Sequence, residues 1–264
     1  MDMALWTAKS GLTANHENLA IISNNLANAN TAGFKKNRAE FEDLAYQVYR
    51  EPGSPTSELT NSPNGIVLGT GVRLADNKKI FTEGSIVQTD SSLDVAINGR
   101  GFFQVLVPGQ TDMAYTRGGS FQVNELGQLV LHSGYVIQPP IVIPTGTQTV
   151  SVSKDGIVSA TVASAAGNLP QQIGQFEMVD FINPSGLLPV GENLYNQTVS
   201  SGTPLTGTAM LDGFGSLSQG SLESSNVNVV EEMVNLIEAQ RTFEMSSKAV
   251  GAIDNMLQTL NRDI

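Results

Sequence analysis

The side chains best suited to nucleophilic, acid–base or metal chemistry are sparse in this 264-residue chain. It contains no cysteine and only two histidines, His16 and His132, which lie far apart in the sequence. Neither histidine has a second ligand at the spacing of a helical zinc motif. The lack of cysteine excludes thiol nucleophiles, thiolate metal sites and disulfides. We therefore expect both histidines to be surface or interface residues, and we expect no metal site.

Longer catalytic and cofactor-binding motifs are equally scarce. The sequence has no nucleophile elbow and no phosphate loop, and the glycine pairs at 69–71 and 99–101 lack the third glycine of a dinucleotide site. Thirteen acidic residues lie between positions 51 and 212, but nothing marks two of them as a glycosidase pair. The single tryptophan, Trp6, lies outside that region. The sequence thus predicts neither enzymatic activity nor a cofactor.

The charge balance narrows the possible partners. The formal net charge is −11 and only 15% of residues are charged, which makes nucleic acid an unsuitable ligand. The basic cluster Lys35, Lys36 and Arg38 is followed at once by acidic residues and is expected to be a solvated turn. No apolar run approaches the ~18 residues that read as a membrane span. Residues 1–20 are too polar for an ordinary signal peptide, so any export is expected to proceed without a cleaved one.

An apolar side chain recurs every seven residues near the N-terminus. The four positions are Leu5, Leu12, Leu19 and Leu26. The companion position three residues later is small or apolar, with Asn15 as its polar exception. A buried asparagine in such a seam can set the register of the two helices, at some cost in stability. Such a heptad pattern is typical of a helix that packs lengthwise against another helix. We expect this helix to end in the Asn-rich stretch 24–33, with Gly33 as its C-cap.

The C-terminal region repeats the heptad pattern. Its positions are Val229, Leu236, Phe243, Val250 and Leu257. Asn228 is suited to cap the start of this helix, with Glu231 as its capping-box partner. A helix at each end of the chain, each with an apolar stripe and little local core, predicts that the two pair with each other and with copies from other chains. Together they are expected to form a coiled-coil-like, self-assembling domain.

The middle of the chain has the pattern of many short β-strands. Residues 94–107 form a strand-like run that is interrupted by the turn pair at 98–99. Residues 149–153 and 157–162 flank a tight-turn sequence and predict a hairpin. Further β-like runs cover residues 128–136, 141–143 and 175–182. Short strands separated by glycine, proline and asparagine predict a sandwich or barrel-like domain.

The expected fold class is α+β with more than one domain. Looser polar stretches at 51–71 and 198–220 connect the β region to the two helices. The sequence therefore predicts a helical polymerisation domain from residues 1–40 and 222–264. A linker or bridging segment is expected at 41–72, and an inserted all-β outer domain at 73–221.

Several segments resemble the signatures of the bacterial flagellar rod and hook protein family. They are Ser23–Asn28 with Thr31–Lys35, Gly101–Val105, Tyr115–Arg117 with Gly119–Phe121, Gly191–Tyr195, Ser224–Val229 with Glu231 and Met233, and Gln240–Lys248. They span the chain in the family's order. Gly118 departs from the aspartate of many relatives, at what is expected to be a surface turn. The resemblance implies a structural subunit that is not an enzyme.

One further stretch narrows the resemblance within that family. Residues 46–65 are similar to the extra segment that marks distal rod proteins, and the resemblance implies that they bridge successive subunits and stiffen the tube. The residues expected to carry this role are Tyr46, Tyr49, Arg50, Pro52, Gly53, Pro63 and Gly65. A proximal rod protein of similar length and architecture is the nearest alternative.

The resemblance also implies partners and a location. The expected partners are further copies of the chain in a helical polymer, proximal rod proteins, the hook protein, the surrounding periplasmic and outer-membrane ring proteins, and the flagellar type III export apparatus. The expected location is the flagellar basal body, where the rod crosses the periplasm. From the residues alone, a different class stays open, namely a secreted β-rich binding module or adhesin displayed on coiled-coil arms.

Overall fold

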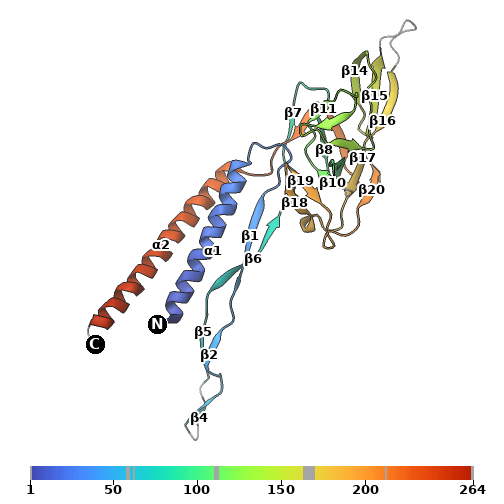
Figure 1. Cartoon of the computed structure of the whole chain (residues 1–264). Coiled ribbons are helices and arrows are strands. Elements are labelled where there is room, and N and C mark those ends of the chain that lie inside the picture. Colours follow the sequence, from blue (N-terminus) through green and yellow to red (C-terminus); the bar gives the residue numbers. More distant parts are fainter. Residues whose placement is uncertain are drawn as a thin grey trace. The chain divides into compact units, whose positions relative to one another are not determined.

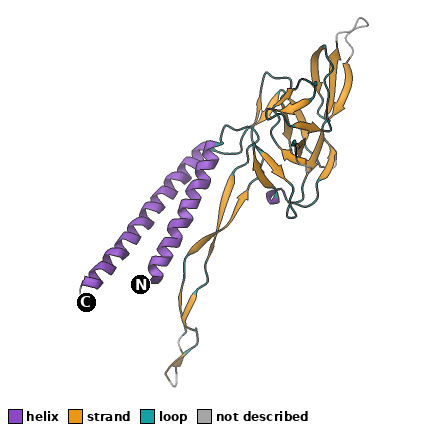
Figure 2. Ribbon diagram, viewed as in Figure 1, coloured by secondary structure: helices purple, strands orange, loops and turns teal. Residues whose placement is uncertain are grey.

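The computed structural model describes residues 2–57, 60–61, 63–109, 113–162, 170–211 and 213–262. Two long helices, α1 (Asp2–Ala27) and α2 (Val229–Arg262), bracket a region of short strands (Figure 2). The predicted α+β class, with a helix at each end and a large β-rich region between, is confirmed. Within the described part, no helix is both long and apolar enough to cross a membrane.

Contacts within the chain divide it into two units. The helix–ribbon unit comprises Met1–Ala27, Asn37–Lys79 and Asn228–Ile264, and the β unit comprises Asn28–Lys36 and Ile80–Val227. Residues 28–36 therefore belong with the β unit, although the sequence pattern grouped them with the first helix. The three-part division drawn from the sequence stays a prediction about which segments fold independently.

α1 and α2 lie side by side and run antiparallel within the helix–ribbon unit (Figure 1). Ala14 and Ile22 of α1 and Ala239 of α2 are buried in this unit. Small side chains at such positions let two helix backbones approach closely, and the apolar stripe supplies the free energy of packing. The predicted helices are therefore present and are amphipathic.

The two helix ends that the sequence marked behave differently. Asn228 Oδ1 accepts hydrogen bonds from the backbone N–H groups of Val230 (3.1 Å) and Glu231 (3.4 Å), so the predicted N-cap of α2 is confirmed. The prediction that Gly33 caps α1 was wrong, because α1 ends well before it. Gly33 has a φ of +70° in a turn of the β unit, where a Cβ atom would lie 2.8 Å from the carbonyl carbon of Arg117.

The stretch between α1 and the β unit is mostly paired β-structure. β1 (Asn37–Asp43) pairs with β6 (Val72–Lys79), β2 (Gln47–Arg50) pairs with β5 (Ile66–Leu68), and β3 (Pro55–Ser57) pairs with β4 (Thr60–Asn61). All three pairs are antiparallel and nested, so they form one two-stranded ribbon (Figure 1). The expectation of a loose polar connection at 51–71 was wrong. Residues 55–57 pair with residues 60–61, and residues 66–68 pair with residues 47–50.

A nine-stranded sheet forms the centre of the β unit. Its main path runs β11-β12-β13-β9-β10-β19-β18, while β17 pairs with both β9 and β20. The strands are β9 (Phe102–Leu106), β10 (Met113–Thr116), β11 (Phe121–Val123), β12 (Leu129–Leu131), β13 (Val136–Gln138), β17 (Glu177–Asp180), β18 (Leu188–Gly191), β19 (Leu194–Asn196) and β20 (Leu205–Thr208). The run predicted at 175–182 thus includes β17, whereas 128–136 contains a turn between two strands.

Smaller sheets complete the β unit. β14 (Thr147–Val152), β15 (Ile157–Val162) and β16 (Pro170–Gln175) form a three-stranded sheet, and the predicted hairpin around Gly156 is confirmed. β8 (Val95–Asn98) pairs with β21 (Ser216–Gln219), β7 (Ile86–Gln88) pairs with β22 (Ser221–Glu223), and a short 3₁₀ helix covers Pro184–Gly186. The predicted break at 98–99 separates β8 from β9, and residues 141–143 contribute an isolated bridge instead of a strand.

Aromatic side chains dominate the core of the β unit. Phe103 is fully buried and lies edge-on to Phe121, with ring centroids 5.1 Å apart, and Phe176 packs against both. A second cluster surrounds Phe102 and Tyr195. Burying one such ring from water contributes about 1.5–3 kcal/mol. The strands around β9 therefore hold together through their own side chains.

Candidate assembly interface

The heptad residues predicted to form the helix seam are only partly covered within one chain. Seven of them are half-buried: Leu5, Leu12, Leu19, Leu26, Leu236, Phe243 and Val250. The side chain of the eighth, Leu257, lies outside the described residues. Among the described residues, the buried apolar side chains of the helix pair are Ala14, Ile22 and Ala239. The helix pair thus leaves part of its predicted seam open to solvent.

A buried polar contact joins the two helices and the ribbon. Asn25 is 2% exposed, and its side-chain amide exchanges two hydrogen bonds with the backbone of Asn37, at 2.8 and 2.9 Å. Asn25 Nδ2 also lies 3.4 Å from Glu232 Oε2 on α2, and Glu232 is itself buried. The heptad pattern pointed to Asn15 as the polar register residue, but Asn15 is half-buried and Asn25 makes this contact instead.

One face of α2 exposes aliphatic side chains to water. Val230, Met233, Val234 and Ile237 are spaced as neighbours on a helix surface, and Val230 is 71% exposed. A contiguous exposed apolar face is unusual for a helix that has only solvent beside it, and such faces mark interaction sites. The heptad count passed over this face because it followed the row through Leu236. The i, i+3, i+4, i+7 spacing in the sequence is the signal that could have found it.

The part of the ribbon that is formed by β2 and β5 is apolar and exposed on both of its faces. Val48 of β2 pairs with Val67 of β5, and both side chains are exposed, as are their neighbours Tyr49, Ile66 and Leu68. Successive residues of a strand point to opposite faces, so both faces of the ribbon carry apolar side chains. A two-stranded ribbon has no second layer of its own to cover either face. This part of the chain therefore offers surface that only another element can bury.

The structure places all seven predicted segment residues on or beside this ribbon. Tyr46, Tyr49, Arg50, Pro52 and Pro63 are exposed, and Gly53 adopts a φ of +82° in the turn that follows β2. Gly65 is half-buried, and a Cβ atom there would lie 2.5 Å from the carbonyl oxygen of Arg50. Close approach of the two chain segments thus explains glycine at 65, and a left-handed turn explains glycine at 53.

A groove of about 380 Å³ lies between α1 and β6 in the same unit. Trp6, Ser10 and Val72 are among its lining residues, and Trp6 is largely exposed. Ser10 Oγ accepts a hydrogen bond from Val72 N at 3.3 Å, which ties the helix to the ribbon at the groove. Gly71 permits this approach, because a Cβ atom there would clash with the Ser10 hydroxyl.

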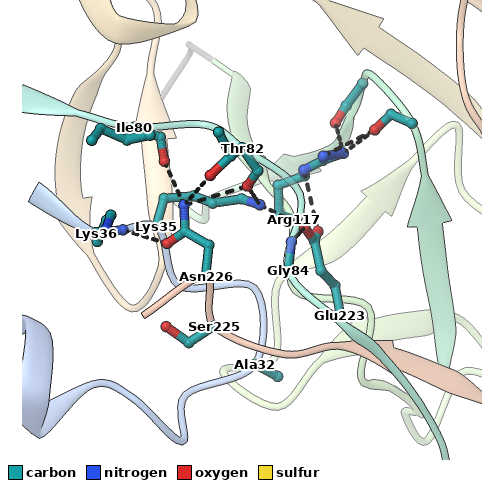
Figure 3. A network of polar contacts seen from close by, with 12 residues as sticks. Ala32, Lys35, Lys36, Ile80, Thr82, Gly84, Arg117, Glu223, Ser225 and Asn226 are labelled. Atoms are coloured by element: carbon teal, nitrogen blue, oxygen red, sulfur yellow. Dashed lines mark hydrogen bonds and ion pairs between the residues drawn. The ribbon is translucent and has the colours of Figure 1, made fainter. Parts of the chain in front are cut away.

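A different kind of site lies inside the β unit. Lys35 has no exposed side-chain surface, and its Nζ lies 2.5 Å from Glu223 Oε1 (Figure 3). Arg117 Nε lies 3.3 Å from Glu223 Oε2, and both side chains are buried. The expectation that Lys35 belongs to a solvated turn was wrong. Burial lowers the pKa of Lys35 below its ordinary value, because the cost of desolvation exceeds the attraction of Glu223.

The described surfaces contain no cluster of side chains that is arranged for catalysis or metal binding. Among the residues that the structure describes, no group of three or more histidine, aspartate or glutamate side chains is placed to hold a metal ion. His16 and His132 are exposed, and the Nε2 atom of His132 lies 3.4 Å from the hydroxyl of the neighbouring Ser133. The apolar faces of α2 and of the ribbon are instead suited to binding another protein surface.

Comparison with known proteins matches nearly the whole chain. Family models for the flagella basal body rod protein, the flagellar hook protein FlgE/F/G D1 domain and the flagellar basal body rod FlgEFG protein C-terminal region match residues 5–35, 96–160 and 218–263. The flagellar basal-body rod protein FlgG of Buchnera aphidicola subsp. Schizaphis graminum is 50% identical over 98% of both chains. That of Borreliella burgdorferi is 45% identical over 99% of this chain and 98% of its own.

A solved structure, that of the Helicobacter pylori flagellar hook protein FlgE2, is 13% identical and covers 72% of this chain and 43% of its own, with a TM-score of 0.24. That similarity is too low to define a common fold, whereas the sequence identity to FlgG proteins extends from end to end. The resemblance read from the signature segments is therefore confirmed. The chain belongs to the FlgG family of flagellar basal-body rod proteins, which are structural components of the bacterial flagellum and not enzymes.

Proposed function

We propose that this chain is a subunit of the distal rod that assembles with copies of itself into a rigid, hollow helical tube. Its role is to transmit torque to the hook and to let exported subunits pass. The observation that carries the proposal is the sequence similarity to FlgG rod proteins, which reaches 50% identity over 98% of both chains. The apolar surface that one chain leaves exposed supports it. Head-to-tail contacts that do not close into a ring generate such a filament.

In this proposal the terminal helices form the inner, coiled-coil-like wall of the tube. The half-buried seam, which includes Leu12, Leu19 and Phe243, and the exposed face around Ile237 supply apolar surface on more than one side of the helix pair. A helix that is apolar on more than one side is suited to contact several neighbours. The β unit, whose core is closed, then forms the outer layer.

The ribbon is assigned to bridging between successive subunits. It exposes Tyr46, Tyr49 and Ile66, and tyrosine is enriched at protein interfaces because it combines a large apolar ring with a hydrogen-bonding hydroxyl. Contacts made through such a bridge resist sliding of one subunit past another. Deletion of residues 46–65 is expected to give a bent, hook-like polymer. Straight rods of normal stiffness from the deletion strain would contradict this assignment.

The surrounding components follow from the same proposal. The subunit lies where the rod crosses the periplasm and contacts proximal rod proteins, the hook protein and the periplasmic and outer-membrane rings. It reaches that place through the flagellar export apparatus without a cleaved signal peptide. The alternative of a secreted β-rich adhesin is not favoured, because relatives that match over 98% of the chain are rod proteins.

Electron microscopy of basal bodies from cells that lack this gene, beside the parent strain, tests the proposal. Rods that stop short and carry no hook are expected, with full-length rods restored by the gene on a plasmid. Complete rods with hooks in the deletion strain would overturn the assignment to the distal rod. A plasmid copy with Arg38→Ala serves as a control, since it alters an exposed ion pair with Glu40 that stabilises little.

A further inference from the structure

Segments from five of the signature regions meet at one place in the β unit. The contributing residues are Ala32, Gly33 and Lys35; Gly101; Arg117; Asn193; and Asn226 with the adjoining Glu223. Figure 3 labels Ala32, Lys35, Arg117, Glu223 and Asn226 of this set, and its dashed lines join strands and connectors that are distant in sequence. Assembly through apolar surfaces does not explain why Lys35, Arg117 and Glu223 are charged and buried.

Glu223 is the charged centre of this cluster. Its Oε1 receives Lys35 Nζ at 2.5 Å and the backbone N–H of Gly84 at 2.9 Å, while its Oε2 faces Arg117 Nε at 3.3 Å. Its backbone carbonyl also accepts a hydrogen bond from the N–H of Gly33, at 2.8 Å. One carboxylate thus compensates two buried cations. Removing it leaves both in a low-dielectric interior, which is far more costly than losing an exposed ion pair.

Arg117 connects this centre to the sheet. Its guanidinium donates to the carbonyl oxygens of Gly99, at 2.7 and 2.9 Å, and of Gly101, at 3.0 Å. The guanidinium carbon lies 5.8 Å from the centre of the Phe102 ring. Arg117 is therefore fixed by the sheet itself, and it presents a positive charge to Glu223 in a set position.

Asn226 performs the corresponding role with hydrogen bonds. Its side-chain oxygen accepts from the backbone N–H of Lys36 at 2.7 Å, and its side-chain nitrogen donates to the carbonyl of Ile80 at 2.9 Å and to Thr82 Oγ1 at 2.9 Å. The backbone N–H of Ile80 in turn donates to the carbonyl of Lys36 at 2.9 Å. One amide side chain thereby joins three separate passes of the backbone.

The three passes are the connectors that lead out of the β unit. Residues 28–36 follow α1, residues 80–85 follow the ribbon, and residues 221–227 precede α2. At two points the packing leaves no room for a side chain. A Cβ atom at Gly84 would clash with the carbonyl oxygen of Ser224 in another connector, and one at Gly33 would lie 2.8 Å from the carbonyl carbon of Arg117. Close packing of backbones and buried polar bonds therefore occur at the same place.

We propose that Glu223 and Asn226 act as positioning residues in a clasp that locks these three connectors to one another and to Arg117. The clasp closes only when residues near both ends of the chain are in place, because Lys35 and Glu223 are 188 positions apart. The aromatic core holds the sheet together without it. The clasp instead fixes the three connectors against one another within the β unit.

Hydrogen–deuterium exchange of the purified full-length chain tests the clasp. In Glu223→Gln, amide exchange in residues 28–36, 80–85 and 221–227 is expected to accelerate at least tenfold, while amides of β9 keep their protection. Adding Lys35→Met to Glu223→Gln is expected to restore part of the protection, because it removes one uncompensated cation. Exchange that is unchanged in the connectors, or that accelerates equally in β9, would overturn the proposal.

Two further variants keep the test decisive if Glu223→Gln does not fold. Asn226→Ala removes the hydrogen-bonding amide without leaving a buried charge, and it is expected to loosen the same three connectors. Arg100→Met serves as the matched control, since it removes a cation from the same unit by breaking the half-exposed pair with Asp180, 2.9 Å apart. The control is expected to leave connector exchange unchanged. Two results would count against the clasp: faster connector exchange in Arg100→Met, or connector exchange in Asn226→Ala that is no faster than in the parent.

Discussion

The two units of this chain differ in the apolar side chains that they bury. The β unit buries its aromatic side chains in clusters around Phe103 and Phe102, and it compensates its buried charges internally. The helix–ribbon unit leaves Tyr49, Ile66 and Ile237 open to water. Apolar side chains of the β unit such as Ile182 are exposed as well, but among the described residues only the β unit has an aromatic core. The helix–ribbon unit therefore depends more on further chains to cover its apolar surface.

The largest expected contrast comes from truncating one large apolar side chain in each unit. Phe103→Ala opens a cavity in a closed core and is expected to lower the free energy of unfolding of the β unit by about 3–5 kcal/mol. Ile237→Ala removes a side chain that is 49% exposed and should cost below ~1 kcal/mol in the isolated chain. Urea titration of both variants measures the difference. Equal losses would show that the two surfaces are not distinct.

A second contrast lies within the helix–ribbon unit. Asn25→Ala removes the side chain that pairs with the backbone N–H and carbonyl of Asn37, and it is expected to cost about 1–3 kcal/mol. Asn15→Ala, at the position that the heptad pattern favoured, should stay within about 0.5 kcal/mol, because Asn15 is half-buried and carries no comparable contact in the described residues. Thermal unfolding followed by helix circular dichroism distinguishes the two. A larger effect at Asn15 would restore the heptad interpretation.

The buried titratable groups of the β unit predict opposing responses to alkaline pH. Burial raises the pKa of Tyr195 above its ordinary value of 10.0, so its stabilising contribution is present below pH 10 and is lost as the pH rises further. Burial lowers the pKa of Lys35 below 10.5, so its contribution is present above pH 10.5 and is lost as the pH falls through the folded-state pKa.

The two effects can be separated by substitution. Tyr195→Phe is expected to remove a loss of up to about 1.4 kcal/mol per pH unit above pH 10. Between the folded-state pKa of Lys35 and pH 10.5, the free energy of unfolding is expected to increase with pH. Lys35→Met should remove this increase. Denaturant unfolding of both variants and the parent between pH 8 and 11 checks the signs. Parallel pH profiles for all three proteins would contradict the assigned burial.

The smallest contrast uses one substitution at two glycines. Gly53→Ala places a side chain at a φ of +82° in the ribbon turn and should destabilise the ribbon locally by about 1 kcal/mol. Gly251→Ala lies within α2, where a Cβ atom meets nothing within 4 Å, and should stabilise the helix by about 0.5–1 kcal/mol. Hydrogen exchange of the ribbon and of α2 reports each effect. The same sign at both positions would contradict the turn geometry.

The sequence predicts the local elements of this fold better than their long-range partners. Heptad spacing predicts both helices, and Asn228 marks the start of α2, because these signals are local. The pairing of β2 with β5 depends on two segments that are separated in the sequence by a polar turn. Because of these polar residues, the stretch 51–71 was predicted to be a loose connection instead of part of a ribbon. The burial of Lys35 could not be read from its neighbours, since Glu223 lies 188 positions away. The face around Ile237 was missed for a different reason, because the heptad count followed only the row through Leu236.

The most direct test of the central claim uses the absence of cysteine from the chain. Cysteine substituted singly at Tyr49 or at Ile237 provides the only thiol of the protein. Both thiols are expected to react rapidly with a maleimide in the dilute, purified chain and to be protected in isolated basal bodies, with full reactivity restored after the rods are dissociated. Equal reactivity in the free chain and in intact basal bodies would contradict the account, because it would show that assembly does not cover these surfaces.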